Sequence, residues 1–102
     1  MQKLINWKVL EVIMIVYRII HKCSEYDIEE NIEAVTSKAK AIKLYNNQVK
    51  KMINDCGEYH AWCRLQKITL NSNLTQKQLI LAIMSDRGFA KKIEELKDWT
   101  IN

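Results

Sequence analysis

The sequence contains no proline, and only two of its 102 residues, Gly57 and Gly88, are glycine. Proline and glycine end helices and form the tight turns of strand-rich folds, so their scarcity argues against a chain of many short strands. Long helices are the simplest consequence. The length corresponds to one domain, residues 1–102, because two domains within this length would each be too small to bury a core.

The sequence contains three cysteines, an odd number that excludes a fully paired disulfide framework. Cys23, Cys56 and Cys63 have no framework-like spacing, which is typical of reduced thiols in a cytosol and not of a secreted disulfide scaffold. We therefore expect a cytoplasmic protein, located in the host cytoplasm if its source is viral.

The most apolar stretch, residues 9–20, is too short to span a membrane. It contains Glu11 and Arg18, whereas a spanning helix needs roughly 20 predominantly apolar residues. The residues that follow contain no small-residue cleavage site of the kind that ends a signal peptide. A buried helix is the better interpretation, and we expect no membrane partner.

The chain does have enough apolar material to fold, together with a modest excess of positive charge. Hydrophobic residues make up 48% of the chain, and the formal net charge is +4. This composition argues against a disordered chain. The positive charge favours the approach of an anionic partner, but it is small for a dedicated nucleic-acid-binding protein.

Apolar residues repeat in heptads between Asp27 and Cys56, which predicts one long helix. Asp27 and Glu30 form a D-x-x-E capping pattern at its start, and Gly57 follows its end. A helix of this length would be about 40 Å long, longer than a compact domain of this size is wide. It would therefore protrude or pair with a second chain.

One seam of these heptads contains a single strongly polar residue, Asn46. A lone asparagine at such a position fixes register and strand number in coiled coils, which predicts a homodimer. An intramolecular bundle in which Asn46 reaches the surface explains the pattern equally well. The predicted dimer or partner interface consists of Ile32, Val35, Ala39, Ile42, Asn46, Val49 and Ile53.

The patterns in the rest of the chain predict further helices. Residues 3–23 form a broad apolar surface, and residues 58–70 fit a helix better than a strand, although a strand remains open. Thr75 and Gln78 form a T-x-x-Q capping box, and apolar spacing predicts a last helix over residues 89–99. The predicted fold is all-α: a bundle of four to five helices built around the long one.

The spacing of Cys56, His60 and Cys63 raises the alternative of a metal site. Their i, i+4, i+7 spacing would place three ligands on one helical face. However, Gly57 is expected to end the helix between them, and the spacing matches no familiar zinc pattern. We therefore predict no metal and no cofactor. The sequence also has no glycine-rich loop to hold a phosphate or an oxyanion, so we predict neither an enzyme nor a small-molecule substrate.

Two short segments are candidates for contact with a partner. Tyr59, His60 and Trp62 form a predicted exposed aromatic contact, since tyrosine and tryptophan are enriched at binding hot spots. Residues 75–96 have the outline of a helix-turn-helix, whose second helix would present the predicted nucleic-acid contacts Arg87, Lys91 and Lys92.

These patterns predict a small non-enzymatic interaction protein that binds a protein partner and self-associates. An inhibitor or adaptor from a phage or mobile element would fit the small size and the missing catalytic groups. The alternative is a dimeric DNA-binding regulator that contacts DNA through the helix-turn-helix-like hairpin at Thr75–Leu96.

Overall fold

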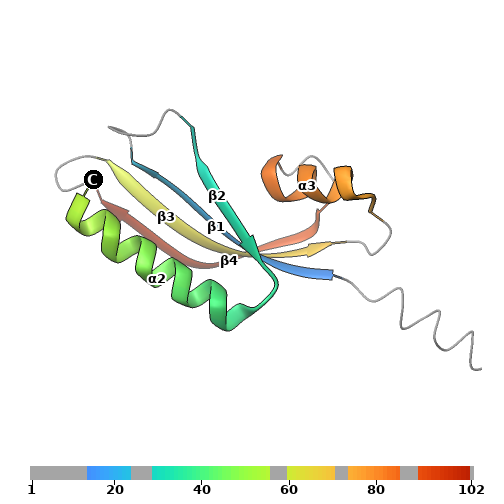
Figure 1. Cartoon of the computed structure of the whole chain (residues 1–102), viewed down its shortest axis with the longest axis horizontal. Coiled ribbons are helices and arrows are strands. Elements are labelled where there is room, and N and C mark those ends of the chain that lie inside the picture. The colour runs from blue at the N-terminus through green and yellow to red at the C-terminus, as the bar shows by residue number, and fades with distance from the viewer. Residues whose placement is uncertain (1–13, 24–28, 56–59, 71–73, 86–89, 102) are drawn as a thin grey trace, which may run out of the picture.

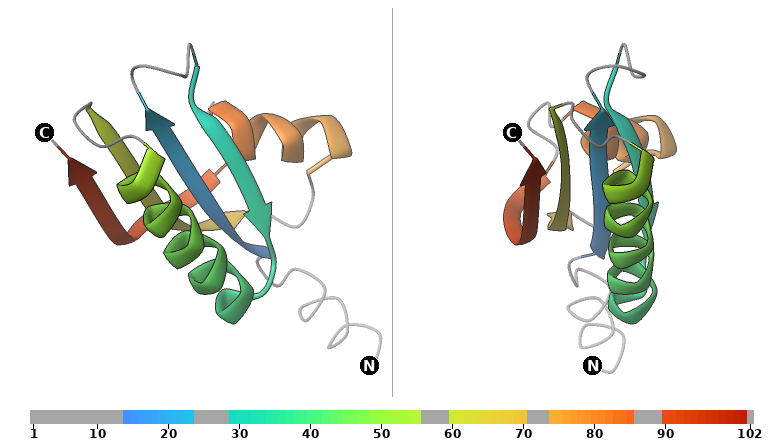
Figure 2. Two further views of the ribbon diagram at one scale, coloured as in Figure 1. Left: turned by 60° about the vertical axis from the view of Figure 1, so that its left-hand side comes forward. Right: turned by 90° about the vertical axis from the view of Figure 1, so that its left-hand side faces the viewer.

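The computed structural model describes residues 14–23, 29–55, 60–70, 74–85 and 90–101. These residues form one four-stranded sheet with a helix against each face (Figures 1 and 2). Along the chain the elements are β1 Met14–Cys23, β2 Asn31–Val35, α2 Lys38–Asp55, β3 Ala61–Leu70, α3 Gln76–Ser85 and β4 Ala90–Ile101. The strand order is β2-β1-β3-β4, and every neighbouring pair is antiparallel.

The prediction of an all-α bundle is therefore wrong, and β1 shows one reason. Tyr17 and Ile19 belong to the core beneath α2, whereas Val16 belongs to the core beneath α3. Because both faces of β1 are buried, its sequence is a continuous apolar run without the alternation of a half-exposed strand. Periodicity alone cannot distinguish such a run from a buried helix.

The prediction of one long helix with a coiled-coil seam is also wrong. Residues 31–35 form the edge strand β2, and α2 begins only at Lys38. The Lys40 backbone N–H donates to Ser37 Oγ at 3.3 Å, so Ser37 caps the helix. Asp27, the predicted cap, lies outside the described residues. The predicted seam is thus divided between a strand and a helix.

The segments predicted as the third and last helices are the strands β3 and β4. The capping box before α3 is confirmed, because Thr75 and Gln78 exchange two hydrogen bonds. The Thr75 backbone N–H donates to Gln78 Oε1 at 3.0 Å, and the Gln78 N–H donates to Thr75 Oγ1 at 3.2 Å.

Two hydrophobic cores lie on opposite faces of the sheet. The larger core, beneath α2, includes the buried residues Tyr17, Ile19, Cys23, Ala41, Tyr45, Met52, Ala61, Cys63 and Leu65. The smaller core, beneath α3, contains the buried residues Val16, Ile68, Leu70 and Ala82. The sheet itself is therefore the layer shared by both cores.

Arg18 connects the sheet to α3. Its side chain is only 2% exposed, and its Nε and Nη2 atoms donate to Gln66 Oε1 at 3.0 and 2.6 Å. Its Nη1 donates to the backbone oxygen of Ile83 at 2.6 Å, near the end of α3. A cation is favourable there because carbonyl groups at a helix C-terminus carry partial negative charge. The guanidinium thus holds α3 against β1 and β3.

Candidate functional site

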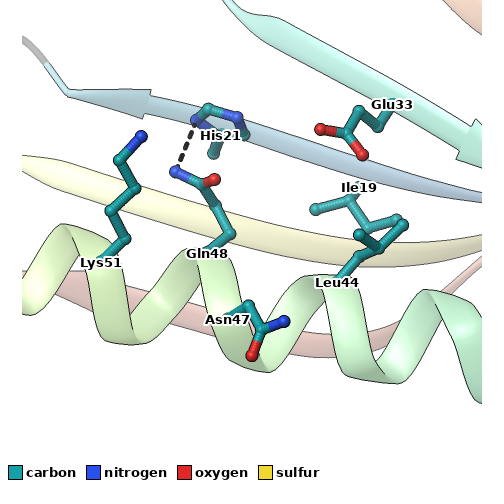
Figure 3. Close-up of a pocket in the computed structure, with 7 residues that line it drawn as sticks. All are labelled: Ile19, His21, Glu33, Leu44, Asn47, Gln48 and Lys51. Atoms are coloured by element: carbon teal, nitrogen blue, oxygen red, sulfur yellow. Dashed lines mark hydrogen bonds between the residues drawn. The ribbon is translucent and has the colours of Figure 1, made fainter.

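The described residues contain a small pocket between α2 and the β1–β2 side of the sheet (Figure 3). Its volume is about 140 Å³, and it is lined by Ile19, His21, Glu33, Leu44, Asn47, Gln48 and Lys51. Pockets that bind drug-sized ligands are usually roughly 300–1,000 Å³. This pocket has room for a small flat group or a single side chain.

Three separate elements position the polar side chains of the pocket. Ile19 and His21 are two residues apart on β1, so both point toward α2. Glu33 on β2 is the register partner of Ile19, which places its side chain on the same face. On α2, Gln48 and Lys51 are three residues apart and lie on one side of the helix.

The pocket combines an apolar floor with groups that donate and accept hydrogen bonds. Ile19 and Leu44 supply apolar contact, and the Glu33 carboxylate is an acceptor. The Gln48 Nε2 atom lies 3.3 Å from His21 Nδ1. The pocket can therefore form hydrogen bonds with the polar edge of a ligand and apolar contacts with its faces.

A thiol next to the pocket is unsuited to nucleophilic chemistry. Cys63 is the register partner of His21, which would suggest a Cys–His pair. However, Cys63 is fully buried, and burial, with a smaller contribution from Asp98, raises the pKa of its thiol from 9.0 to about 12. A catalytic cysteine needs the opposite shift, since the thiolate is the reactive form.

The raised pKa of Cys63 predicts a loss of stability at alkaline pH. Below about pH 9 the thiol is protonated in both the folded and the unfolded chain. Between about pH 9 and pH 12 only the unfolded chain loses this proton, so the free energy of unfolding falls as the pH rises. The fall cannot exceed about 1.4 kcal/mol per pH unit.

Urea unfolding of the wild type and of Cys63→Ala at several pH values between 8 and 11 tests this prediction. The wild type should lose stability more steeply than the variant, because the variant has no thiol at position 63 and also lacks the contribution of Cys63 to the raised pKa of Tyr45. Parallel pH profiles would show that Cys63 ionises equally in the folded and unfolded chains.

The structure does not bring the predicted interface residues onto one surface. Val35, Ile42 and Val49 pack against the core beneath α2. Asn46 and Ile53, in contrast, are exposed on α2. Of the remaining two residues, Ala39 is also exposed on α2, and Ile32 is half-buried on β2 opposite Ile20.

The predicted aromatic contact is described only in part, because Tyr59 lies outside the described residues. His60 is exposed just before β3, and Trp62 is half-buried within it. The Arg64 guanidinium carbon lies 4.7 Å from the centre of the Trp62 ring, a cation–π geometry. Trp62 is thus already in contact with a cation of the same strand.

The helix-turn-helix is not formed, since a strand follows α3. Lys91 and Lys92 are exposed on β4, and Arg87 lies outside the described residues. The Lys92 Nζ atom lies 2.7 Å from Glu94 Oε1. This contact lowers the pKa of Glu94 and raises that of Lys92. No recognition helix presents these lysines.

The metal site considered from the sequence cannot be followed as a whole, because Cys56 lies outside the described residues. Of the other two residues, Cys63 is buried beneath α2 and His60 is exposed. Within the described ranges, no three His, Cys, Asp or Glu side chains form a group that could hold a metal ion.

Reasoning from the sequence predicted neither the pocket nor the hydrogen bonds of Arg18 to Gln66 and Ile83. His21 lies within residues 3–23, and Glu33 and Gln48 lie between Asp27 and Cys56, two segments that were predicted to be helices. The one available signal was Arg18 itself, since a charged residue inside an apolar run needs a buried partner.

No protein-family model, no curated protein and no solved structure matches this chain. Neither α2 nor α3 is long and apolar enough to cross a membrane.

Proposed function

We propose that this chain is a small non-enzymatic interaction protein that binds another protein through the surface around α3. The observation that carries the proposal is an apolar strip on the side of α3 away from the sheet. It consists of Ile80 and Met84, which are 52% and 54% exposed. Residues four positions apart are neighbours on a helix surface, so the two side chains form one strip.

Two further exposed apolar side chains lie on the face of the sheet that α3 covers. Met14 on β1 and Ile93 on β4 are also exposed. Their register partners, Leu70 and Ile68, belong to the core beneath α3, so all four side chains lie on the α3 face of the sheet. Exposed large apolar side chains that gather on one face of a molecule are typical of an interaction site.

The composition of α3 supports the same conclusion. Its inner side packs Leu79, Ala82 and Ile83 against the sheet, while its outer side is also apolar. A helix that is apolar on all sides is normally covered on more than one side. Methionine adapts readily to different partners, which suits Met84 to such a surface.

A second copy of the chain is the partner to which we commit, in a reducing cytoplasm where Cys63 keeps a free thiol. Static light scattering over a concentration series tests this. The wild type should approach twice its monomer mass of 12.1 kDa, and Ile80→Glu should remain a monomer at all concentrations.

Ile53→Glu is the matched control, because Ile53 is 53% exposed on α2, on the other face of the sheet. This variant should associate like the wild type. A monomeric wild type, or equal dissociation of both variants, would contradict an interface at α3.

A further inference from the structure

The solvent-facing side of α2 is a stripe of lysine and asparagine. It consists of Lys40, Lys43, Asn47, Lys50, Lys51 and Asn54, all of them exposed. At 100° per residue these six positions lie within an arc of about 100°, opposite the buried Ala41, Tyr45 and Met52. We call this surface the basic stripe.

The basic stripe contains no negative charge to neutralise it. The one acidic residue of α2 is Asp55, at its last position and outside the stripe. The ion pairs among the described residues involve Arg64, Lys67 and Lys92, and none of them includes a lysine of α2. Four ammonium groups are therefore available to an anionic partner.

The geometry of the stripe suits a chain of phosphates. Lys40 and Lys51 are eleven residues apart, which corresponds to about 16 Å along the helix axis. Lysines spaced along such a length can contact successive phosphates, and amides such as that of Asn47 add hydrogen bonds. Helices that lie on membranes insert an apolar face into the lipid, whereas the apolar face of α2 is buried against the sheet.

The pocket of Figure 3 adjoins the basic stripe, because Asn47 and Lys51 belong to both. Its volume of about 140 Å³ is suited to one small flat heterocycle. The half-buried Leu44 offers apolar contact to a face of such a ring, and His21 offers an aromatic surface. Ile19 is only 2% exposed and forms part of the pocket floor. The Glu33 carboxylate can accept a hydrogen bond from the exocyclic amino group of a base.

We propose that the basic stripe and the pocket together bind single-stranded nucleic acid. The lysines contact the phosphates, and one unstacked base enters the pocket. A duplex keeps its bases stacked and paired, so only a single strand offers both groups without the cost of opening base pairs. This site lies on the α2 face of the sheet, opposite the protein-binding surface around α3, and does not depend on it.

Fluorescence anisotropy with two labelled 12-nucleotide strands, one of cytidines and one abasic, separates base from phosphate binding. The wild type should bind the cytidine strand at least about fivefold more tightly, the lower end of what stacking one base contributes. Equal affinities for the two strands, or tighter binding to anionic phospholipid vesicles than to the cytidine strand, would overturn the proposal.

A charge-matched pair of variants tests the basic stripe. The double variant Lys43→Glu, Lys50→Glu should weaken binding of the cytidine strand at least about tenfold at low salt. The slope of log affinity against log salt concentration should become shallower by about 1.4. The control double variant Lys77→Glu, Lys91→Glu has the same net charge, but its substitutions lie on α3 and β4. It should weaken binding less than threefold. An equal loss in both variants would show that only overall charge matters and would overturn the proposed site.

Discussion

Replacing Gln66 by leucine is expected to lower the free energy of unfolding by about 1.5–3 kcal/mol. The Gln66 Oε1 atom accepts hydrogen bonds from two nitrogens of Arg18, whose side chain is buried. Without this oxygen, two N–H groups of a buried guanidinium lose this acceptor. Hydrogen bonds to a charged group contribute more than hydrogen bonds between neutral groups.

Arg18→Met should be at least as damaging as Gln66→Leu, because it removes the hydrogen bonds to Gln66 Oε1 and also the one to the Ile83 carbonyl. The double variant Arg18→Met, Gln66→Leu should lose less stability than the sum of the two single variants, because each single variant already removes the hydrogen bonds between Arg18 and Gln66.

Urea unfolding followed by circular dichroism measures these differences. Gln76→Leu is the control, because Gln76 is exposed at the first position of α3 and should change stability by less than about 0.5 kcal/mol. If Gln66→Leu were as mild as Gln76→Leu, the hydrogen bonds between Arg18 and Gln66 would contribute nothing measurable to stability, which would contradict this prediction.

Leu65→Ala is expected to lower the free energy of unfolding by about 2–5 kcal/mol. Leu65 is fully buried in β3 beneath α2, within the larger core. Removing its side chain leaves a cavity between a central strand and a helix, and the lost contacts add to the lost burial of apolar surface.

The control for this cavity is Leu96→Ala on the edge strand β4, where the leucine side chain is exposed. This variant should cost less than about 1 kcal/mol, because water already contacts much of the side chain. Similar losses for the two leucines in thermal or urea unfolding would contradict the placement of Leu65 between sheet and helix.

Local signals in the sequence were sufficient where the interaction spans only a few residues. The capping box of Thr75 and Gln78 predicted the start of α3, and both of its hydrogen bonds are present. A cap satisfies backbone groups within its own turn, so its effect is independent of the rest of the fold.

In β3 the same kind of local reasoning failed for a physical reason. Ala61, Leu65 and Ile68 have the i, i+4, i+7 spacing of a helix. Ala61 and Leu65 face α2, whereas Ile68 faces the core beneath α3. The first half of the strand buries its side chains under α2, and the second half buries its side chains under α3. The buried positions therefore do not alternate along the whole strand, and Ala61, Leu65 and Ile68 resemble a helical repeat.

In β4 an irregularity of the ladder produced a similar error. Gln66 pairs with Glu95 and Leu65 with Lys97, so Leu96 is an extra residue in β4 at this point. A β-bulge of this kind displaces the side chains that follow and breaks the period of two. The spacing of Ile93 and Leu96, interpreted as one face of a helix, spans this bulge.

The candidate site could not be assembled from the sequence, because its parts come from three elements. His21 and Glu33 are brought together by the antiparallel pairing of β1 with β2, and Gln48 is added by the packing of α2. The lysines of the basic stripe were visible in the sequence, since Lys40, Lys43, Lys50 and Lys51 lie near one another on any helix through these residues.

By itself, the sequence determined the amount of apolar material, the positive charge, the cap of α3 and the helical character of residues 38–55. Tertiary structure decided that residues 31–35 leave this helix and become a strand, and that residues 14–23, 61–70 and 90–101 pair in one sheet. Helix hydrogen bonds join residues four apart, so a local pattern can reveal them. Strand hydrogen bonds join residues far apart in the sequence, and an apolar run becomes a strand only when the partner strands and covering helices are in place.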